Sequence, residues 1–582
     1  MPLHNADIAR AFEDIADLLE LGDENPFRIR AYRNAARIIG DLQLDIAASI
    51  GHGEELPKLP GIGEDLSGKI REIVMTGHCA LLERLRKKTP AAITELLRIP
   101  NLGPKRVKAL YRGLEVRTLD ELYRAAREGR IRGLPGFGEK SELSILQSVE
   151  ARLSKGRRFK LAVAAQYADS VADYLRKSDG VAQVVVAGSL RRMRETVGDI
   201  DILATADPSS DVMSRFVGYD EVHEVLSRGD TRSSVVLRSG IQVDLRVVPR
   251  ESYGAALHYF TGSKAHNIAI RRLAQARGLK LNEYGIFRGA KRVSGETEES
   301  VFAAVRLPYI PPELREDRGE IEAAKAGRLP RLVELGDLKG DLHCHTRWTD
   351  GHNSIREMAL AAKAHGLEYL AITDHSRRLT AVHGLDPARL REQIDEIGRT
   401  EVPGIALLKG IEVDILEDGT LDLPDSLLAE LDLVVAAVHS NFNLPRARQT
   451  ERILRALDHP LVAMLAHPSG RLIDAREAYD VDMLRIIRKA AARGRFLELN
   501  AHPERLDLLD AHCRMARDEG VLVGISSDAH SVQQFDNLKY GIGQARRGWL
   551  EKKDVLNALS LGELRRLLPG KRSDRAREKA LT

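Results

Sequence analysis

The chain has 582 residues, which is enough for three to five compact domains that each bury a core. Its 43% hydrophobic and 30% charged residues match a soluble globular protein, and no apolar run approaches a membrane span. The first residues lack the basic-then-apolar layout of a signal peptide. Cys79, Cys344 and Cys513 lie far apart with no paired spacing, so we expect a protein of the reducing cytoplasm with no membrane partner.

The net charge of +4 is weak evidence for a nucleic-acid partner. Basic residues gather locally at 155–158 and in the tail, 571–582. Charge runs of this kind are more often solvated faces than contacts, so a DNA-binding role for the tail stays open.

Three segments of the N-terminal part repeat one pattern: Leu-Pro-Gly-Ile-Gly at 59–63, Ile-Pro-Asn-Leu-Gly at 99–103 and Leu-Pro-Gly-Phe-Gly at 134–138. Each precedes a stretch that can form a helix. A glycine-rich turn that opens a helix presents unpaired amides and the positive end of the helix dipole, which suits a phosphate. One copy alone would more often be a plain helix-hairpin turn.

Three copies with adjacent lysines and arginines resemble helix-hairpin-helix modules, which hold DNA backbones without reading bases. The resemblance implies DNA as the partner and not a small acceptor. It also implies backbone contacts at Gly61, Gly63, Gly103, Lys105, Gly136 and Gly138.

The segments Asn25–Arg28 and Ala31–Ala36 resemble the N-terminal lyase domain of DNA polymerase beta, which would cover residues 1–90. In this resemblance Lys69 falls on the lysine that forms a Schiff base with an abasic sugar. Arg28 stands where animal relatives carry a lysine that helps to bind the 5′-phosphate. Two interpretations of Lys69 stay open, a lyase nucleophile and a phosphate contact on a DNA-binding helix.

Further along the chain, three acids are expected on the polar faces of two strands. Asp199 and Asp201 are two residues apart, so an extended strand points both carboxylates to one face. Asp244 lies on the polar face of an alternating strand at 241–247. Three convergent carboxylates suit the two divalent ions of a phosphoryl-transfer site. A bare Asp-x-Asp would fit an ordinary strand with solvent-facing acids equally well.

A turn for a nucleotide phosphate is expected just before these acids. The apolar run 181–187 predicts a buried strand that enters a turn at Gly188 and Ser189. This turn supplies exposed backbone amides and one hydroxyl. The turn and the three acids together favour a nucleotide-binding phosphoryl-transfer site.

This arrangement resembles the nucleotidyltransferase superfamily and, more narrowly, the X-family DNA polymerases related to polymerase beta. A second block with the same resemblance is Tyr259–Ser263, followed by Asn267, Arg271 and Asn282–Tyr284. In that family the Tyr-Phe turn lies against the sugar of the incoming nucleotide and helps to exclude a ribose 2′-hydroxyl. The positions of Asn267 and Arg271 contact the nascent base pair and the template.

The resemblance implies that Asp199, Asp201 and Asp244 are catalytic and bind Mg²⁺ or Mn²⁺. The implied contacts of the dNTP are Gly188, Ser189, Arg192, Gly198, Tyr259, Phe260, Gly262, Asn267 and Arg271. Gln242 is a departure, because many relatives carry an arginine beside the third aspartate.

The chain from 307 to 336 is charged and punctuated by prolines, so we expect a linker at 316–336. Beyond it, apolar runs alternate with helix-length stretches, which predicts a parallel barrel. The predicted strands lie within 338–346, 367–376, 406–416, 431–440, 461–470, 495–501 and 521–530.

Acids or histidines end six of these strands, and the C-terminal rim is where such barrels place their chemistry. The candidate metal ligands are His343, His345, Asp350, His375, Glu412, His439, His467, Asp528 and His530. Any one of them would more often be a satisfied histidine or acid at a strand end. Imidazoles with a few carboxylates suit zinc, manganese or iron rather than calcium.

This part of the chain resembles a PHP (polymerase and histidinol phosphatase) domain, a (β/α)₇ barrel with a three-metal cluster. The resemblance implies one ion on His343, His345, Glu412 and Asp528, and a second on Glu412, His439 and His467. The third ion would be held by Asp350, His375 and His530. In bacterial X-family polymerases this domain is associated with a 3′-5′ exonuclease favoured by manganese and with the removal of blocked 3′ ends.

The sequence therefore predicts a multidomain α+β and α/β protein that fills short gaps in base excision repair, as in bacterial- or archaeal-type X-family polymerases. We expect a monomer acting on gapped or nicked DNA with dNTPs. The expected parts are a lyase-type helical domain (1–90), fingers (91–155), palm (156–250), thumb (251–315), linker (316–336), PHP barrel (337–570) and tail (571–582). The alternatives are a template-independent nucleotidyltransferase and a DNA-end scaffold whose barrel is only structural.

Overall fold

The structure is a computed structural model that describes residues 5–41, 46, 50, 61–88, 93, 96, 97, 99, 102–155 and 158–569. The basic tail, residues 156 and 157, and the first residues of two repeated turns (59, 60, 100 and 101) lie outside this part of the chain. The chain divides into two compact units, of which one is mainly Gly156–Leu332 with Gly543–Glu551. None of the described helices is long and apolar enough to cross a membrane.

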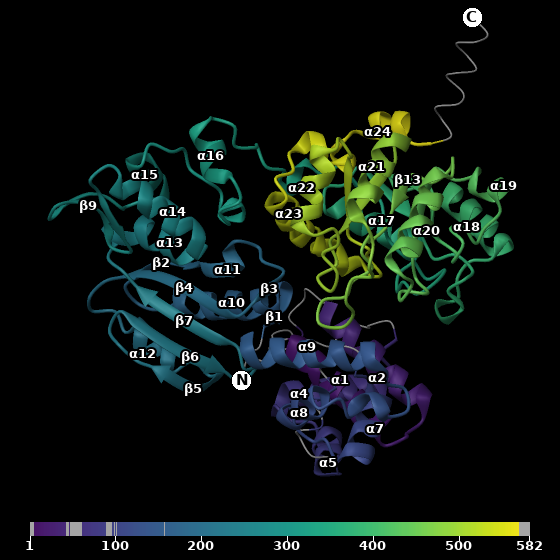
Figure 1. Ribbon diagram of the computed structural model, residues 1–582, viewed down its shortest axis with the longest axis horizontal. Coiled ribbons are helices and arrows are strands. Elements are labelled where there is room, and N and C mark those ends of the chain that lie inside the picture. The colour runs from purple at the N-terminus through teal and green to yellow at the C-terminus, as the bar shows by residue number, and fades with distance from the viewer. Residues whose placement is uncertain are drawn as a thin grey trace, which may run out of the picture. The chain divides into compact units, whose positions relative to one another are not determined.

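The N-terminal part is helical (Figure 1). Glycines of the repeated turns lie at the starts of its helices. Gly63 and Gly103 are the N-cap residues of α4 and α7, and Gly138 directly precedes α9. Gly61 and Gly136 have φ values of 79° and 84°, a region that favours glycine. The helices are α1 (Asn5–Leu21), α2 (Pro26–Asp41), α4 (Glu64–Thr76), α5 (Ala80–Lys88), α7 (Pro104–Leu114), α8 (Leu119–Arg127), η1 (Ile131–Gly133) and α9 (Glu139–Lys155).

The expected palm is a five-stranded sheet in the order β2-β4-β7-β6-β5. Strands β4 and β7 are parallel and adjacent, while their other neighbours in the sheet are antiparallel. Helix α10 packs on the sheet through a buried face that includes Tyr167 and Val171. The elements are β1 (Phe159–Lys160), α10 (Leu161–Arg176), β2 (Val181–Val186), α11 (Gly188–Arg191), β3 (Thr196–Val197), β4 (Asp199–Ala206), α12 (Val212–Val217), β5 (Val222–Ser227), β6 (Arg232–Leu237) and β7 (Gln242–Val247).

The expected thumb packs its helices around Phe302, which is fully buried. Helix α13 approaches the chain before α15 so closely that a Cβ on Gly254 would lie 2.1 Å from the Thr297 carbonyl carbon. Three antiparallel strands form a small sheet in the order β10-β9-β8. The elements are η2 (Arg250–Ser252), α13 (Tyr253–Thr261), α14 (Lys264–Gln275), β8 (Lys280–Asn282), β9 (Gly285–Arg288), β10 (Lys291–Ser294), α15 (Glu298–Ala304) and η3 (Pro312–Leu314).

Much of the expected linker at 316–336 is packed on this core and does not form a free tether. It contains α16 (Glu320–Lys325), whose Ile321 and Ala324 are buried in the same cluster as Phe302. Leu332 also belongs to that cluster. The spacing of Ile321 and Ala324 gives a short apolar face that the surrounding charges hide in the sequence.

The C-terminal part confirms the expected barrel of seven parallel strands, in the order β11 to β17. An isolated parallel bridge pairs Cys344, after β11, with Ala529, after β17, and brings the two ends of the sheet together. Helices surround the strands (Figure 1). The strands are β11 (Gly340–Asp341), β12 (Tyr369–Ile372), β13 (Ala406–Asp414), β14 (Leu433–Ala437), β15 (Met464–Leu465), β16 (Phe496–Asn500) and β17 (Val523–Ser526).

The helices of the barrel connect these strands and extend beyond the last of them. Capping boxes at Ser354 and Ser560 define the starts of α17 and α24. The helices in this part of the chain are η4 (Leu335–Asp337), α17 (Ile355–Ala364), η5 (Thr380–Val382), α18 (Pro387–Arg399), α19 (Asp425–Leu428), α20 (Arg446–Asp458), α21 (Met483–Arg493), α22 (Asp510–Asp518), η6 (Val532–Asn537), α23 (Leu538–Arg547), η7 (Lys552–Asp554), η8 (Leu556–Ala558) and α24 (Leu561–Leu567).

The buried side chain of Asn557 connects the first and last strands. Its Nδ2 donates to the carbonyl oxygens of Gly340 and Ile525, both at 2.7 Å, and its Oδ1 accepts from the Ile525 amide at 2.9 Å. We predict that Asn557→Ala lowers the stability of the barrel by about 3 kcal/mol, because three buried backbone groups lose their partner. Urea unfolding followed by Trp348 fluorescence in a Trp549→Phe background measures this.

The matched control is Arg391→Ala, which removes only an exposed ion pair with Glu430. It should change the stability by less than about 0.5 kcal/mol. Equal effects of the two substitutions would show that Asn557 does not hold the barrel closed.

Candidate active sites and metal centre

The three acids of the palm lie on adjacent strands. Asp199 and Asp201 are on β4, and Asp201 pairs in register with Asp244 on β7. Burial and the nearby Asp199 and Asp244 raise the pKa of Asp201 to about 7. Burial and Asp244 also raise the pKa of Asp199. Carboxylates that repel one another in this way are stabilised by a shared cation, so the group suits divalent metal ions.

The turn before β4 approaches these acids closely. Gly188 has a φ of 63°, and a Cβ there would lie 2.2 Å from the Asp201 Oδ2. Only glycine therefore allows this approach. The Ser189 Oγ is buried and has no hydrogen-bond partner in the described part of the chain, which fits a hydroxyl kept for a ligand. Gly198 lies just before Asp199. A Cβ added to Gly198 would be 3.3 Å from the Arg158 Nη1.

The residues expected to contact the nucleotide form a connected group beside the palm acids. Arg192 donates a hydrogen bond to the carbonyl oxygen of Thr261, and its Nε lies 3.1 Å from Glu316 Oε1. A Cβ on Gly262 would lie 3.2 Å from the Arg192 Nη1. The expected triphosphate contact is thus held beside the Tyr-Phe turn, with Glu316 as its counter-ion in this structure.

The two aromatic residues of the turn contact neighbouring polar side chains. Asn267 Nδ2 donates to the Tyr259 carbonyl oxygen at 2.6 Å, and the Arg271 guanidinium carbon lies 5.9 Å from the Tyr259 ring centre. The Tyr259 and Phe260 rings are edge to face at 5.1 Å. The structure therefore brings the expected sugar and template contacts together.

Two arginines that contact the candidate nucleotide site were missed by the sequence analysis. Arg191 donates to both oxygens of Glu298, at 3.0 and 2.6 Å, and to the Thr261 hydroxyl at 2.7 Å. Arg246 lies 4.1 Å from the centre of the Phe260 ring. The alternation of β7 puts Arg246 on the same face as Asp244, and this was the sequence signal for Arg246. We found no such signal for the contacts of Arg191.

Glu412, at the C-terminal end of β13, is the centre of the barrel site. Its side chain is 1% exposed, and its carboxylate contacts five imidazoles. Burial alone would raise the pKa of Glu412, but His439, His375 and His343 hold it well below its usual value. The N–O distances are 2.7 Å to His375, 2.8 Å to His467, 3.2 Å to His439, 3.5 Å to His343 and 3.8 Å to His345.

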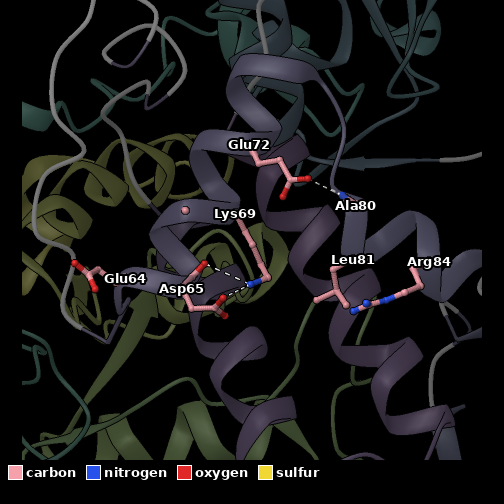
Figure 2. A pocket seen from close by; sticks show the side chains of 8 residues that line it. Glu64, Asp65, Lys69, Glu72, Ala80, Leu81 and Arg84 are labelled. Carbon is pink, nitrogen blue, oxygen red and sulfur yellow. Dashed lines mark hydrogen bonds and ion pairs between the residues drawn. The ribbon is translucent and has the colours of Figure 1, made fainter.

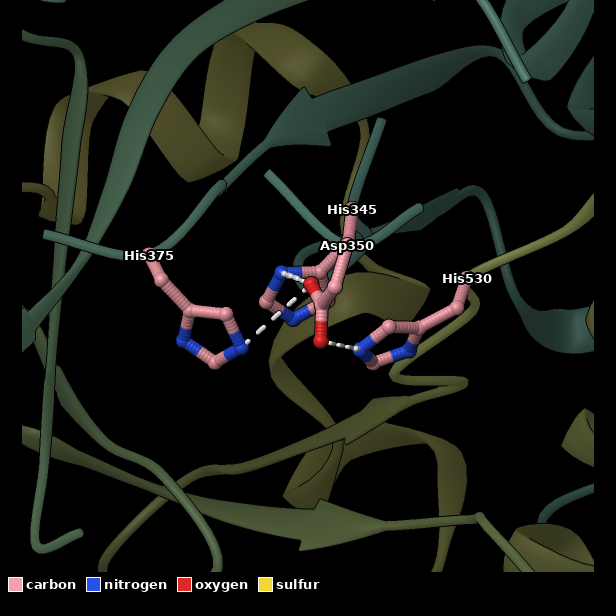
Figure 3. A group of neighbouring side chains, drawn as sticks. All are labelled: His345, Asp350, His375 and His530. Atoms are coloured by element: carbon pink, nitrogen blue, oxygen red, sulfur yellow. Dashed lines mark ion pairs between the residues drawn. The ribbon is translucent and has the colours of Figure 1, made fainter. Parts of the chain in front are cut away.

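Asp350 forms a second centre, with three histidines around its carboxylate (Figure 3). The distances from its oxygens are 3.3 Å to His530, 3.6 Å to His375 and 3.8 Å to His345. Asp528 in turn lies 3.0 Å from His345 and 3.6 Å from His343. All nine candidate ligands are thus brought to the rim of one barrel.

Three groups of these side chains have ligand atoms close enough for a shared ion: His345, Asp350, His375 and His530; His343, His345 and Asp528; His375, Glu412 and His439. Imidazole nitrogens with a few carboxylate oxygens fit zinc, manganese or iron. The overlap of the groups through His345 and His375 also suits adjacent ions.

Lys69 lies in a pocket between α4 and α5 (Figure 2). Its Nζ is 2.5 Å from Asp65 Oδ1. Burial would lower the pKa of Lys69, but the Asp65 hydrogen bond and Tyr32 raise it above the usual value. The lysine is therefore held protonated in this structure, while a nucleophile must be neutral. The pocket is lined by Glu64, Asp65, Gly68, Lys69, Glu72, Ala80, Leu81 and Arg84.

Family models match four regions of the chain. They are a helix-hairpin-helix domain (residues 3–79), a SAM-like helix-hairpin-helix tandem (93–151), the DNA polymerase beta thumb (256–316) and the PHP domain (341–502). The DNA polymerase/3′-5′ exonuclease PolX of Bacillus subtilis (strain 168) is 39% identical over 578 residues. This similarity covers 98% of the chain and 100% of the relative.

The chain belongs to the PolX family. As a PolX protein with helix-hairpin-helix, thumb and PHP domains, it binds DNA and depends on divalent metal ions. Part of the chain is also similar to proteins named as probable phosphatases. A probable phosphatase of Thermoanaerobacter sp. (strain X514) is 27% identical over 40% of the chain and 95% of the relative. A probable phosphatase of Acetivibrio thermocellus is 30% identical over 34% of the chain and 83% of the relative.

The PolX barrel also contains buried acids that hold its histidines from behind. Glu498 Oε1 is 2.7 Å from His343 Nδ1, and its Oε2 accepts from the His467 amide at 2.7 Å. A carboxylate behind a ligand histidine fixes the orientation and tautomer of the ring. The sequence analysis missed Glu498, although an acid between Leu497 and Leu499 in a buried strand was a signal for it.

We predict that Glu498→Gln lowers the affinity of the barrel for Mn²⁺ by about 10- to 100-fold, because the orienting charge behind His343 is lost. Equilibrium dialysis at controlled free Mn²⁺, followed by elemental analysis, measures the bound metal. The control is Glu430→Gln on the barrel surface, which should retain the wild-type metal content. Unchanged Mn²⁺ affinity in Glu498→Gln would mean that Glu498 does not support the metal site.

Proposed function

We propose that this PolX protein fills short gaps in damaged DNA, as in base excision repair, and trims 3′ ends with its barrel. It is a DNA polymerase with a PHP-domain 3′-5′ exonuclease. The observation that carries the repair proposal is the presence of two separate acid-rich sites in one chain. A polymerase that can also remove 3′ nucleotides can process a damaged end before filling the gap.

In the palm, we assign Asp199, Asp201 and Asp244 to two Mg²⁺ or Mn²⁺ ions. Bound ions would lower the barrier to phosphoryl transfer by neutralising the charge on the attacking and leaving oxygens. The Gly188–Ser189 turn would hold the triphosphate, and Arg192 would exchange Glu316 for a phosphate oxygen. Tyr259 and Phe260 would lie against the sugar, so they would select dNTPs.

In the barrel, we assign the nine rim ligands to a cluster of manganese, zinc or iron ions that promotes hydrolysis of a phosphodiester. Glu412 would serve two ions at once, since both of its oxygens face imidazole nitrogens. The glycine turns at Gly61, Gly63, Gly103, Gly136 and Gly138, with Lys105, would hold the backbone of gapped or nicked DNA. We expect the protein to act as a cytoplasmic monomer.

Two alternatives fit the chain less well. A template-independent nucleotidyltransferase would not need repeated helix-hairpin-helix turns for a DNA backbone. A DNA-end scaffold would not need nine metal-ligand side chains at the rim of its barrel, since burying charges without a cation costs stability.

Separate substitutions in the two sites test the proposal on one gapped, 3′-labelled duplex. Asp201→Ala should abolish nucleotide addition but leave Mn²⁺-dependent degradation and DNA affinity close to wild type, because the palm ions serve only addition. Glu412→Ala should do the reverse, since it removes a ligand of the barrel cluster. Loss of degradation in Asp201→Ala alone, with full degradation in Glu412→Ala, would contradict the assignment.

We propose that Lys69 supports a lyase activity, which the Asp65 ion pair restrains. We predict that Asp65→Asn increases the borohydride-trapped adduct with a 5′-terminal abasic sugar, because losing the carboxylate lowers the Lys69 pKa and frees more neutral amine. Lys69→Ala should abolish the adduct. If neither wild type nor Asp65→Asn forms one under conditions that allow gap filling, Lys69 is only a phosphate contact.

A further inference from the structure

Arg505 lies beside the metal-ligand cluster, on the loop that follows β16. Its Nε is 3.6 Å from the Asp528 Oδ2, and its side chain is 18% exposed. Burial and the nearby Arg505 charge both lower the pKa of His467. The guanidinium is therefore placed next to side chains assigned to two of the ions.

The guanidinium of Arg505 is incompletely satisfied by the protein. Its Nη1 is buried and has no hydrogen-bond partner among the described residues. Arg452, a buried arginine elsewhere in the barrel, instead donates to the carbonyl oxygens of Leu416 and Ser440, each at 2.8 Å, and of Ile415. A buried donor without an acceptor costs about 1–3 kcal/mol, so such a group is expected to have an acceptor that is not part of the chain.

The backbone that carries Arg505 is held in place. Asn500 and Asp507 exchange backbone hydrogen bonds at 2.6 and 3.2 Å across the loop. Arg471 donates to the carbonyl oxygens of Arg505 at 2.8 Å and Leu506 at 2.6 Å. The arginine therefore has a fixed base, which a group that must meet a substrate atom accurately requires.

The surroundings of Arg505 favour an anion. Burial and Arg505 lower the pKa of Arg476 to about 10, so these two cations are close enough to repel one another. Arg476 also lies 4.0 Å from the centre of the Phe442 ring, which stacks on Tyr479. Neighbouring arginines create a positive field, and the planar guanidinium matches the geometry of phosphate oxygens.

We propose that Arg505 is a catalytic residue of the exonuclease that binds the non-bridging oxygens of the scissile DNA phosphate. This inference rests on the proposed function of the barrel. Water attacks phosphorus, the bond between phosphorus and the 3′ oxygen breaks, and the released nucleotide keeps the water oxygen. One proton of the water passes to the leaving 3′ oxygen. Arg505 neutralises charge on the phosphate while this exchange proceeds.

The test compares Arg505→Gln and Arg505→Lys with Arg391→Gln, an exposed control on α18. Arg505→Gln should reduce 3′-5′ degradation on the order of 100-fold, as loss of a charged donor to a transition state does. Arg505→Lys should retain part of the rate, since lysine keeps the positive charge but lacks the paired N–H donors of the guanidinium. Gap filling with dNTPs should stay unchanged in all three variants.

Binding of inorganic phosphate separates substrate contact from a structural role. The Mn²⁺-loaded protein broadens the phosphorus resonance of bound phosphate, and a titration of this broadening gives the Kd of the protein for inorganic phosphate. We expect a Kd at least about 10-fold higher in Arg505→Gln, in line with a lost charge-assisted contact. The Mn²⁺ content, measured by elemental analysis, should equal that of wild type.

Two outcomes would overturn the inference, and a third would overturn the proposed function of the barrel. Loss of Mn²⁺ from both Arg505 variants would make Arg505 a counter-ion for the ligands, and wild-type phosphate binding would exclude the contact. If wild type itself showed no Mn²⁺-dependent degradation, the proposed function of the barrel would fail. In that case a higher phosphate Kd in Arg505→Gln would still show that Arg505 binds phosphate, and an unchanged Kd would overturn the inference as well.

Discussion

A carboxylate buried among imidazoles is the constraint on which the barrel site depends. Glu412 is buried at the end of β13, and five histidines contact its two oxygens. The imidazoles around Glu412 differ in how readily they accept a proton. Burial opposes protonation of His375, but Glu412 and Asp350 raise its pKa to about 10. Burial lowers the pKa of His345 and His467 to about 3. Metal ions bind deprotonated rings, so an ion bound at His375 would replace the proton that Glu412 and Asp350 favour there.

The palm also contains buried carboxylates whose charge a cation would stabilise, but fewer groups take part. Asp201 has a pKa raised to about 7 because burial and two other carboxylates oppose its charge. The tight approach of Gly188 leaves no side chain between the phosphate turn and this carboxylate. Both sites therefore concentrate negative charge at strand ends, where a divalent ion and a phosphate can meet. The strands hold the geometry, and the charges create the need for cations.

Local patterns made the architecture predictable from the sequence, and they pointed to most of the residues that the structure brings together at the candidate sites. Apolar runs predicted the seven barrel strands, and Gly63 and Gly103 indicated the starts of the helices that they cap. The contacts that the groups supporting these sites make were not predictable, because their partners are distant in the chain. Arg191 and Glu298 are 107 residues apart, and His343 and Glu498 are 155 apart. The prediction of a free linker at 316–336 missed α16 for a different reason. This helix packs on the core through a short apolar face, which the charged residues around it hide in the sequence.

The most direct test of this account is a crystal structure with Mn²⁺ and anomalous data collected at the manganese edge. We predict separate manganese peaks at the barrel rim, with each Glu412 oxygen within a coordination distance of about 2 Å of an ion. Histidine rings that now contact Glu412 should turn toward the ions. A Glu412 carboxylate that stays hydrogen-bonded to His375 and His467, with no ion beside it, would contradict the account.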